Sequence, residues 1–295
     1  CEPTAIGQFA QANALTLKRV VEDDMNQYID MPRLGLGTWQ LTDQQAIDTV
    51  ALAIQMGYRH IDTAPRYENE AAVGLGLQQS GVDRKELFVT TKIWHDQLAP
   101  EAMRRSAAAS LERLQLDTVD LLLIHWPNPD PAWRLGDSLQ TLLEIKQQGW
   151  AKNIGVANFP VALLQQAWGI LGEELKVNQV EYHFALQQQA LLGFTQNHNM
   201  LLTAYSPLAR GDFNEHPVLL AIAAKHGANV GQIALAWLLR QDGVAAIPKA
   251  SSVAHLQSNL QAASIELDAE DLAQLQAIPK NQRLINPDFA PQWDA

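Results

Sequence analysis

Short apolar runs alternate with longer amphipathic stretches from Pro32 almost to the end of this chain, and this alternation limits the possible folds most strongly. The stretches carry apolar residues at spacings of three and four, as Ala46, Val50, Ala53 and Ile54 do, which is typical of one face of a helix. The apolar runs have the length of strands. Eight of them predict strands at Leu34–Gly37, Tyr58–Ile61, Leu87–Thr91, Val119–Ile124, Asn153–Val156, Val177–Val180, Leu201–Ala204 and Ala245–Ile247.

The strand expected at Val119–Ile124 reads VDLLLI, a largely apolar run that is typical of a strand covered on both faces. Eight such strands alternating with helices predict an α/β protein, a closed (β/α)8 TIM barrel, with one extra helix near His216–His226. A chain of 295 residues suits such a barrel as a single domain. Helices are expected to begin at Thr42–Asp43 and at Leu267–Asp268. The active site of a barrel lies at the carboxyl ends of its strands.

The two ends of the chain are expected to differ from the barrel. We expect residues 31–295 to form the barrel domain and residues 1–30 to be an N-terminal extension. Leu15, Leu17, Val20 and Val21 suit a hairpin in that extension, and disorder suits the pattern equally. The proline-containing segment 280–295 is expected to be an extended tail over or near the barrel mouth.

Composition limits the partners. A formal net charge of -11 disfavours nucleic acid, which is bound through lysine and arginine facing phosphates. No apolar run approaches the length needed to cross a bilayer. We therefore expect a cytoplasmic protein that acts on small molecules. We also expect a monomer, but the sequence carries no signal for the oligomeric state. Cys1 is the only cysteine, which excludes an internal disulfide; whether it is a processed lipoprotein terminus or an artificial end stays open.

Candidate chemistry is concentrated in the stretch Gly57–Glu70, which reads GYRHIDTAPRYENE. Asp62 and Tyr67 lie on an expected strand-to-helix loop, and loops on a rigid scaffold commonly carry function. Lys92 and His125 follow where two later strands run out. Each has an ordinary structural explanation, such as a helix cap, a packed ring, a surface charge or a core histidine. Their convergence at successive strand ends favours a proton-donating site.

In such a site Tyr67 would be the proton donor. A free phenol has a pKa near 10, and an adjacent ammonium favours the phenolate. We expect Lys92, held by Asp62, to lower the pKa of Tyr67 by about 2–3 units, and His125 to donate a hydrogen bond to a carbonyl oxygen.

The chain resembles the aldo-keto reductase family in motifs that run in order from about Met31 to Ile285. They read GYRHIDTAPRYENEAAVG, TTKIW, VDLLLIHWP, IGVANF, NQVEYH, AYSPLARG and IPK followed by SNL. Within the family the chain is most similar to the bacterial 2,5-diketo-D-gluconic acid reductases, which share its short loops and an ending like NQRLINPDFAPQWD.

This resemblance implies NADPH-dependent reduction of aldehyde or ketone carbonyls of small substrates, such as 2,5-diketo-D-gluconate or methylglyoxal. It implies a catalytic tetrad of Asp62, Tyr67, Lys92 and His125. It also implies cofactor contacts from Thr38, Trp39, Asn158, Gln179, Tyr205, Ser206, Leu208, Arg210, Lys249, His255 and Asn259. Asn158 and Gln179 would hold the nicotinamide amide, and Tyr205 would stack on its ring. The chain has no GxGxxG loop, so no Rossmann site is expected.

Three positions depart from the family pattern, with Ala157 and Ala250 where serine is usual and His255 where arginine is usual. An imidazole cannot bind a phosphate through two donors as a guanidinium does. Only Lys249 is then a clear cation for the extra phosphate of NADPH. We expect NADPH to be the cofactor and NADH to be usable.

The aromatic residues expected to line the substrate pocket are Trp39, Trp94 and Trp126. A tryptophan at a strand end is more often a core residue, but all three stand at matching motif positions. Short loops after Trp94 and Arg210 predict an open mouth and small, polar aldehydes or ketones.

Two alternatives remain. A metal-dependent barrel hydrolase would use His60, Asp62, His125 and His183. We expect at most one of His60 and Asp62 to face the mouth, Lys92 would have no role and no His-x-His pair is present, so no metal is expected. The other alternative is a cofactor-binding regulatory protein of the same fold.

Overall fold

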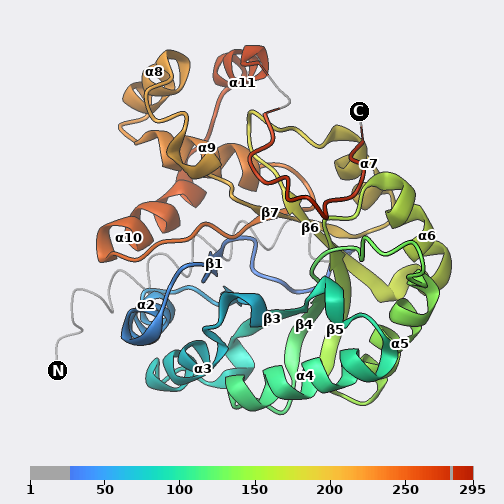
Figure 1. The fold of residues 1–295 in the computed structure, drawn as a ribbon. Coiled ribbons are helices and arrows are strands. Elements are labelled where there is room, and N and C mark those ends of the chain that lie inside the picture. Colours follow the sequence, from blue (N-terminus) through green and yellow to red (C-terminus); the bar gives the residue numbers. More distant parts are fainter. Residues whose placement is uncertain (1–26, 280–281, 295) are drawn as a thin grey trace.

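The computed structural model describes residues 27–279 and 282–294, which form a ring of strands surrounded by helices (Figure 1). The strands are β1 (Gly35–Gly37), β2 (His60–Asp62), β3 (Phe88–Ile93), β4 (Val119–Ile124), β5 (Ala151–Ala157), β6 (Leu175–Glu181), β7 (Leu201–Tyr205) and β8 (Val244–Ala246). The helices are α2 (Asp43–Gln55), α3 (Glu70–Gln79), α4 (Pro100–Leu114), α5 (Leu135–Gln147), α6 (Val161–Leu171), α7 (Gln189–Asn197), α8 (Pro217–Lys225), α9 (Val230–Leu239), α10 (Val253–Gln261) and α11 (Ala269–Ala277).

The strands form one parallel sheet in the order β1 to β8. Parallel bridges from Leu34 to Ala246 and from Gly37 to Lys249 join the first strand to the last, so the sheet curls into a nearly closed barrel. A Cβ at Gly37 would lie 2.6 Å from the carbonyl oxygen of Ile247, and only glycine fits this closure. The predicted (β/α)8 barrel is confirmed, and α8 is the extra helix expected after the seventh strand.

The boundaries differ from the prediction in instructive places. Asp62 is the last residue of β2, paired with Thr90, and not the first residue of a loop. Asp268 caps α11 with its side chain, as expected, whereas Thr42 precedes α2 without a side-chain capping bond.

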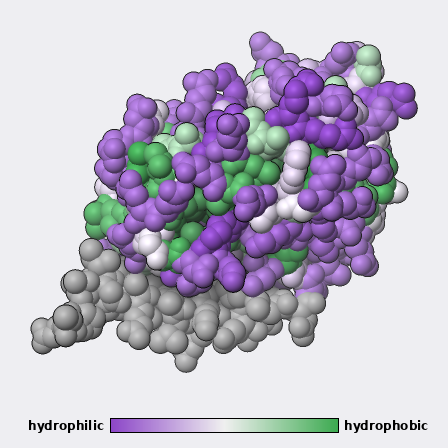
Figure 2. Space-filling view, turned by 90° about the horizontal axis from the view of Figure 1, so that it is seen from below, coloured by the Kyte–Doolittle hydropathy of each residue, from purple (hydrophilic) through white to green (hydrophobic). Residues whose placement is uncertain are grey.

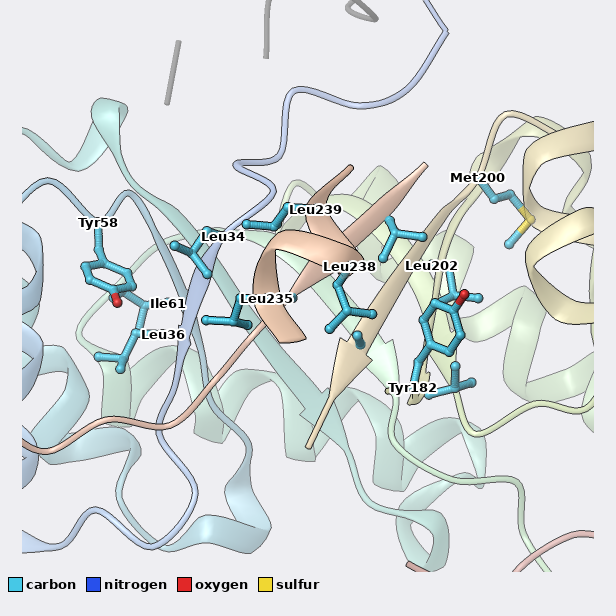
Figure 3. Packing of buried hydrophobic residues seen from close by; sticks show 14 of the residues in the cluster. Leu34, Leu36, Tyr58, Ile61, Tyr182, Met200, Leu202, Leu235, Leu238 and Leu239 are labelled. Carbon is cyan, nitrogen blue, oxygen red and sulfur yellow. The ribbon is translucent and has the colours of Figure 1, made fainter. Parts of the chain in front are cut away.

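Side chains of the strands enter two apolar clusters, one inside the barrel and one between barrel and helices. On β4, Leu121 and Leu123 belong to the inner cluster while Leu122 and Ile124 belong to the outer one. Both faces of the strand are therefore buried, as its composition predicted. Figure 3 shows part of the outer cluster, where three leucines of α9 lie near residues in or next to the strands: Leu235, Leu238 and Leu239 beside Leu34, Leu36, Ile61 and Leu202.

The expected hairpin at Leu15, Leu17, Val20 and Val21 lies outside the described residues. Where the description begins, the hydroxyl of Tyr28 donates to Asp242, just before β8. On the face drawn in Figure 2, hydrophilic residues predominate and hydrophobic ones gather in limited patches. In the described ranges no single helix has the length and apolar character to span a membrane; α8 and α9 meet those criteria only as a pair bent by 83°.

Candidate active site

A cavity of about 1620 Å³ opens at the carboxyl ends of the strands and extends to α8, α9 and α10. All the site residues predicted from the sequence line it except Lys92, which is fully buried. The lining set comprises Thr38, Trp39, Asp62, Tyr67, Trp94, His125, Trp126, Asn158, Gln179, Tyr205, Ser206, Leu208, Arg210, Lys249, His255 and Asn259. The structure thus brings the predicted residues to one continuous site.

Lys92 lies beneath the floor of this cavity and joins the predicted residues together. Its ammonium donates to Asp62 Oδ1 at 2.5 Å, to the carbonyl oxygen of Thr63 at 2.9 Å and to Tyr67 OH at 3.2 Å. The register explains the contact, because Asp62 pairs with Thr90 on β3 and Lys92, two residues on, points to the same side of the strand. Burial opposes the charged form of Lys92, but Asp62 and Tyr67 outweigh it and its pKa is raised.

The second carboxylate oxygen of Asp62 is held from across the barrel. Gln179, on β6, donates its side-chain Nε2 to Asp62 Oδ2 at 2.7 Å. This contact was not expected from the sequence. It leaves the carbonyl oxygen of Gln179 as the side-chain atom that can accept from a ligand, so its predicted bond to the nicotinamide amide stays a prediction.

The environment of Tyr67 corrects one expectation. Burial raises the pKa of the phenol, and the opposing effect of Lys92 does not outweigh it. The predicted net lowering of this pKa was wrong, because the sequence shows the cation but not the desolvation of the phenolate. Tyr67 is therefore fully protonated at neutral pH, which is the state a proton donor needs.

His125 lies directly after β4 and faces Tyr67, with ring centroids 5.8 Å apart and an interplanar angle of 82°. Burial, Lys92 and His95 all lower its pKa well below the ordinary value, so the imidazole is neutral. Its Nδ1 is buried without a hydrogen-bond partner among the described residues. A neutral imidazole can donate one hydrogen bond to a carbonyl oxygen without bringing a second positive charge beside Lys92.

Asn158 connects the histidine to the seventh strand. Its Nδ2 donates to the carbonyl oxygen of His125 at 2.9 Å, and its Oδ1 accepts from Tyr205 OH at 2.8 Å. Its backbone is left-handed, with φ of 62°, and the cavity residues Ser206 and Arg210 have φ of 48° and 54°. Such non-glycine conformations are unfavourable and concentrate at functional sites.

The end of the cavity away from Tyr67, called the distal arm below, carries positive charge and no acidic side chain among its lining residues. Lys249 and His255 are exposed there, and Asn259 is buried in the wall. Arg210 lies over the ring of Trp39, with Cζ 5.2 Å from its centroid.

The end of the cavity around Tyr67 and His125, called the catalytic end below, has aromatic walls. The C-terminal segment, residues 282–294, contributes to them. Trp94 and Trp126 line the cavity as predicted, and Phe289 lies 5.6 Å and 5.5 Å from their ring centroids. A short 3-10 helix, η3 (His95–Gln97), follows Trp94 at once, so the loop is short as expected. The sequence argument missed Phe289 and Arg66, another lining residue; an aromatic residue in the proline-containing tail was the available signal for the first.

The four residues considered for a metal are engaged separately. His60 contacts Thr90, one layer below the mouth, and His183 contacts Glu181. Of His60 and Asp62, only Asp62 lines the cavity. Residues two apart on a strand share one face, so the two side chains differ in depth and not in the face from which they project. Within residues 27–279 and 282–294 no group of three His, Cys, Asp or Glu side chains is arranged to hold a metal ion.

A parallel barrel that gathers a tyrosine, a lysine, an aspartate and a histidine at the ends of its strands belongs with the barrel enzymes that reduce carbonyl groups. The family model described as "Aldo/keto reductase family" matches residues 33–280, and the chain belongs to this family. It is an oxidoreductase that uses a nicotinamide cofactor, NADH or NADPH, and acts on small carbonyl compounds.

Known proteins support this assignment. The chain is 41% identical to methylglyoxal reductase DkgB from Escherichia coli O157:H7 over 266 residues, 90% of this chain and 99% of that protein. It is 39% identical to glyoxal reductase from Bacillus subtilis (strain 168) over 264 residues, 88% and 94% of the two chains. A crystal structure of a proposed 2,5-diketo-D-gluconic acid reductase B superposes with a TM-score of 0.87 at 34% identity, covering 90% of this chain and 94% of that one.

Proposed function

We propose that this enzyme reduces small dicarbonyl compounds of the methylglyoxal type to hydroxycarbonyls with NADPH, and that Tyr67 supplies the proton. The observation that carries the proposal is the buried ammonium of Lys92, 3.2 Å from the phenol oxygen. The similarity to reductases of methylglyoxal and glyoxal supports the choice of substrate class.

Each residue of the site has its own role in this reaction. His125 donates a hydrogen bond that polarises the substrate carbonyl, and the cofactor, when bound, supplies the hydride to its carbon. Tyr67 transfers its proton to the carbonyl oxygen, which completes the alcohol. The phenolate left behind lies beside the Lys92 ammonium, and Asp62 and Thr63 hold that ammonium in place. Stabilising this developing charge offsets the high pKa that burial gives the phenol.

The long arm of the cavity fits a dinucleotide by the chemistry of its walls. Asn158, Gln179 and Tyr205 lie beside the catalytic end and would hold and cover the nicotinamide. Ser206, Leu208 and Arg210 would lie along the pyrophosphate, and Lys249 and Asn259 would meet the adenosine end. Lys249 provides a point charge for the extra phosphate of NADPH, whereas His255 beside it offers only an imidazole.

The basic test follows the absorbance of NADPH during reduction of methylglyoxal. We expect turnover that persists after treatment with a chelator. Loss of turnover on chelation would favour a metal-dependent enzyme, and tight NADPH binding without turnover would favour a regulatory protein of the same fold.

The His255→Arg variant is expected to raise the preference for NADPH over NADH, measured as the ratio of kcat/KM values, by about tenfold, because one charge-assisted hydrogen bond is worth about 1.5–3 kcal/mol. Val253→Arg is a matched control, since it adds the same charge to the same helix at an exposed position outside the cavity. An unchanged ratio in His255→Arg would show that this side chain does not face the phosphate.

A further inference from the structure

Glu181 is a fully buried carboxylate that the proposed mechanism does not use. It is the last residue of β6 and does not line the cavity. Its Oε1 accepts hydrogen bonds from the backbone N–H of Leu284 at 2.8 Å and from His183 Nε2 at 3.0 Å. Its Oε2 accepts from the backbone N–H of Ile285 at 2.9 Å. One buried side chain therefore binds two successive amides of the C-terminal segment.

The C-terminal segment, residues 282–294, contains neither helix nor strand. Its position therefore depends on contacts of its backbone and side chains, including Arg283, whose Nη1 lies 4.0 Å from Glu181 Oε2. Besides Glu181, the N–H of Gln282 donates to the carbonyl oxygen of Ala185 at 2.9 Å, and the Asp294 carboxylate accepts from the N–H of Val161 at 2.9 Å. Both contacts lie at the ends of the segment, whereas Glu181 binds Leu284 and Ile285, which themselves line the cavity.

The part of the segment that Glu181 holds leads directly into the wall of the catalytic end. Residues 284–287 and Phe289 line the cavity. The ring of Phe289 lies 4.3 Å from that of His95 and packs edge-on against Trp94 and Trp126. A shift of this segment would remove one aromatic wall and leave the Lys92 and Tyr67 contacts in place.

We propose that Glu181 is a positioning residue that clamps the C-terminal segment over the barrel mouth, and that this clamp selects carbonyl compounds with a flat apolar group able to pack against Phe289. The proposal rests on the proposed function for its kinetic consequence. The evidence for the clamp itself is the hydrogen bonds, because a buried carboxylate is stable only while donors surround both of its oxygens.

The test is Glu181→Gln, which replaces one carboxylate oxygen with an NH₂ group. The new NH₂ group must face a backbone N–H of Leu284 or Ile285, or the His183 Nε2 donor, and donors do not pair with donors. We expect faster hydrogen exchange across residues 282–294. We also expect KM for phenylglyoxal to rise about tenfold, the size of a lost aromatic contact, with kcat for methylglyoxal changed by less than about twofold.

A double-mutant cycle separates the clamp from a general structural defect. Phe289→Ala alone should raise KM for phenylglyoxal by a similar factor and should add little in the Glu181→Gln background, because the ring is already displaced. Glu112→Gln, the same substitution at an exposed position of α4, should change neither the hydrogen exchange of residues 282–294 nor the kinetics.

Unchanged exchange in the C-terminal segment, or effects of Glu181→Gln and Phe289→Ala that simply multiply, would overturn the clamp. A wild-type enzyme that reduces neither dicarbonyl would instead reject the proposed function. The exchange measurement would still decide the clamp in that case.

Discussion

Tyr67→Phe is expected to lower kcat for methylglyoxal reduction by about 10²–10⁴, the usual contribution of a general acid. Phenylalanine keeps the ring and its contact with His125 but has no proton to transfer. NADPH binding, measured by fluorescence titration, should stay close to that of the wild type. Tyr28→Phe, which removes the same hydroxyl at the opposite end of the barrel, should leave turnover intact.

The same residue predicts the pH profile. Burial raises the pKa of Tyr67, so the phenol remains protonated through the neutral range. The rate of reduction should be level there and should fall only above about pH 10, where even a free phenol ionises. A decline in the rate between pH 7 and pH 9 that occurs with either cofactor, NADPH or NADH, would contradict a raised pKa of Tyr67.

Lys92→Met is expected to abolish turnover and also to destabilise the protein by about 3–5 kcal/mol, because it leaves Asp62 buried without its cation. Urea denaturation measures the second effect. Activity should be lost together with the ammonium that stabilises the phenolate.

The double variant Asp62→Asn/Lys92→Met separates the two roles of this pair. Removing both charges leaves a neutral site in which the introduced amide still offers its carbonyl oxygen to Gln179, so most of the lost stability should return. Turnover should not return, because the proton donor has no ammonium beside it. A double variant as unstable as Lys92→Met would show that the unpaired carboxylate is not the cause.

In the proposed mechanism, the network around Lys92 would serve both folding and catalysis. The ammonium is fully buried and has three oxygen partners from β2, the loop after it and Tyr67. A buried charge requires such partners, and the same partners fix the cation at the distance that the phenolate needs. Stability and the proposed reactivity would therefore depend on the same atoms.

The barrel and the location of the candidate site could be predicted from the sequence. Strand and helix periodicities are local properties, so eight apolar runs separated by amphipathic stretches were enough to predict the order of elements. Since all strands of a parallel barrel end on one side, polar residues after successive strands had to meet. Asp62, Tyr67 and His125 were found in this way, and all three line the cavity.

Three features could be seen only in the folded structure: the sign of the Tyr67 pKa shift, the bond from Gln179 to Asp62 and the bonds from Leu284 and Ile285 to Glu181. The first depends on desolvation, which arises only when the walls of the barrel exclude water. The other two join residues separated by 117 and 103 positions. Such contacts are set by the register and closure of the barrel, and no local pattern in the chain encodes them.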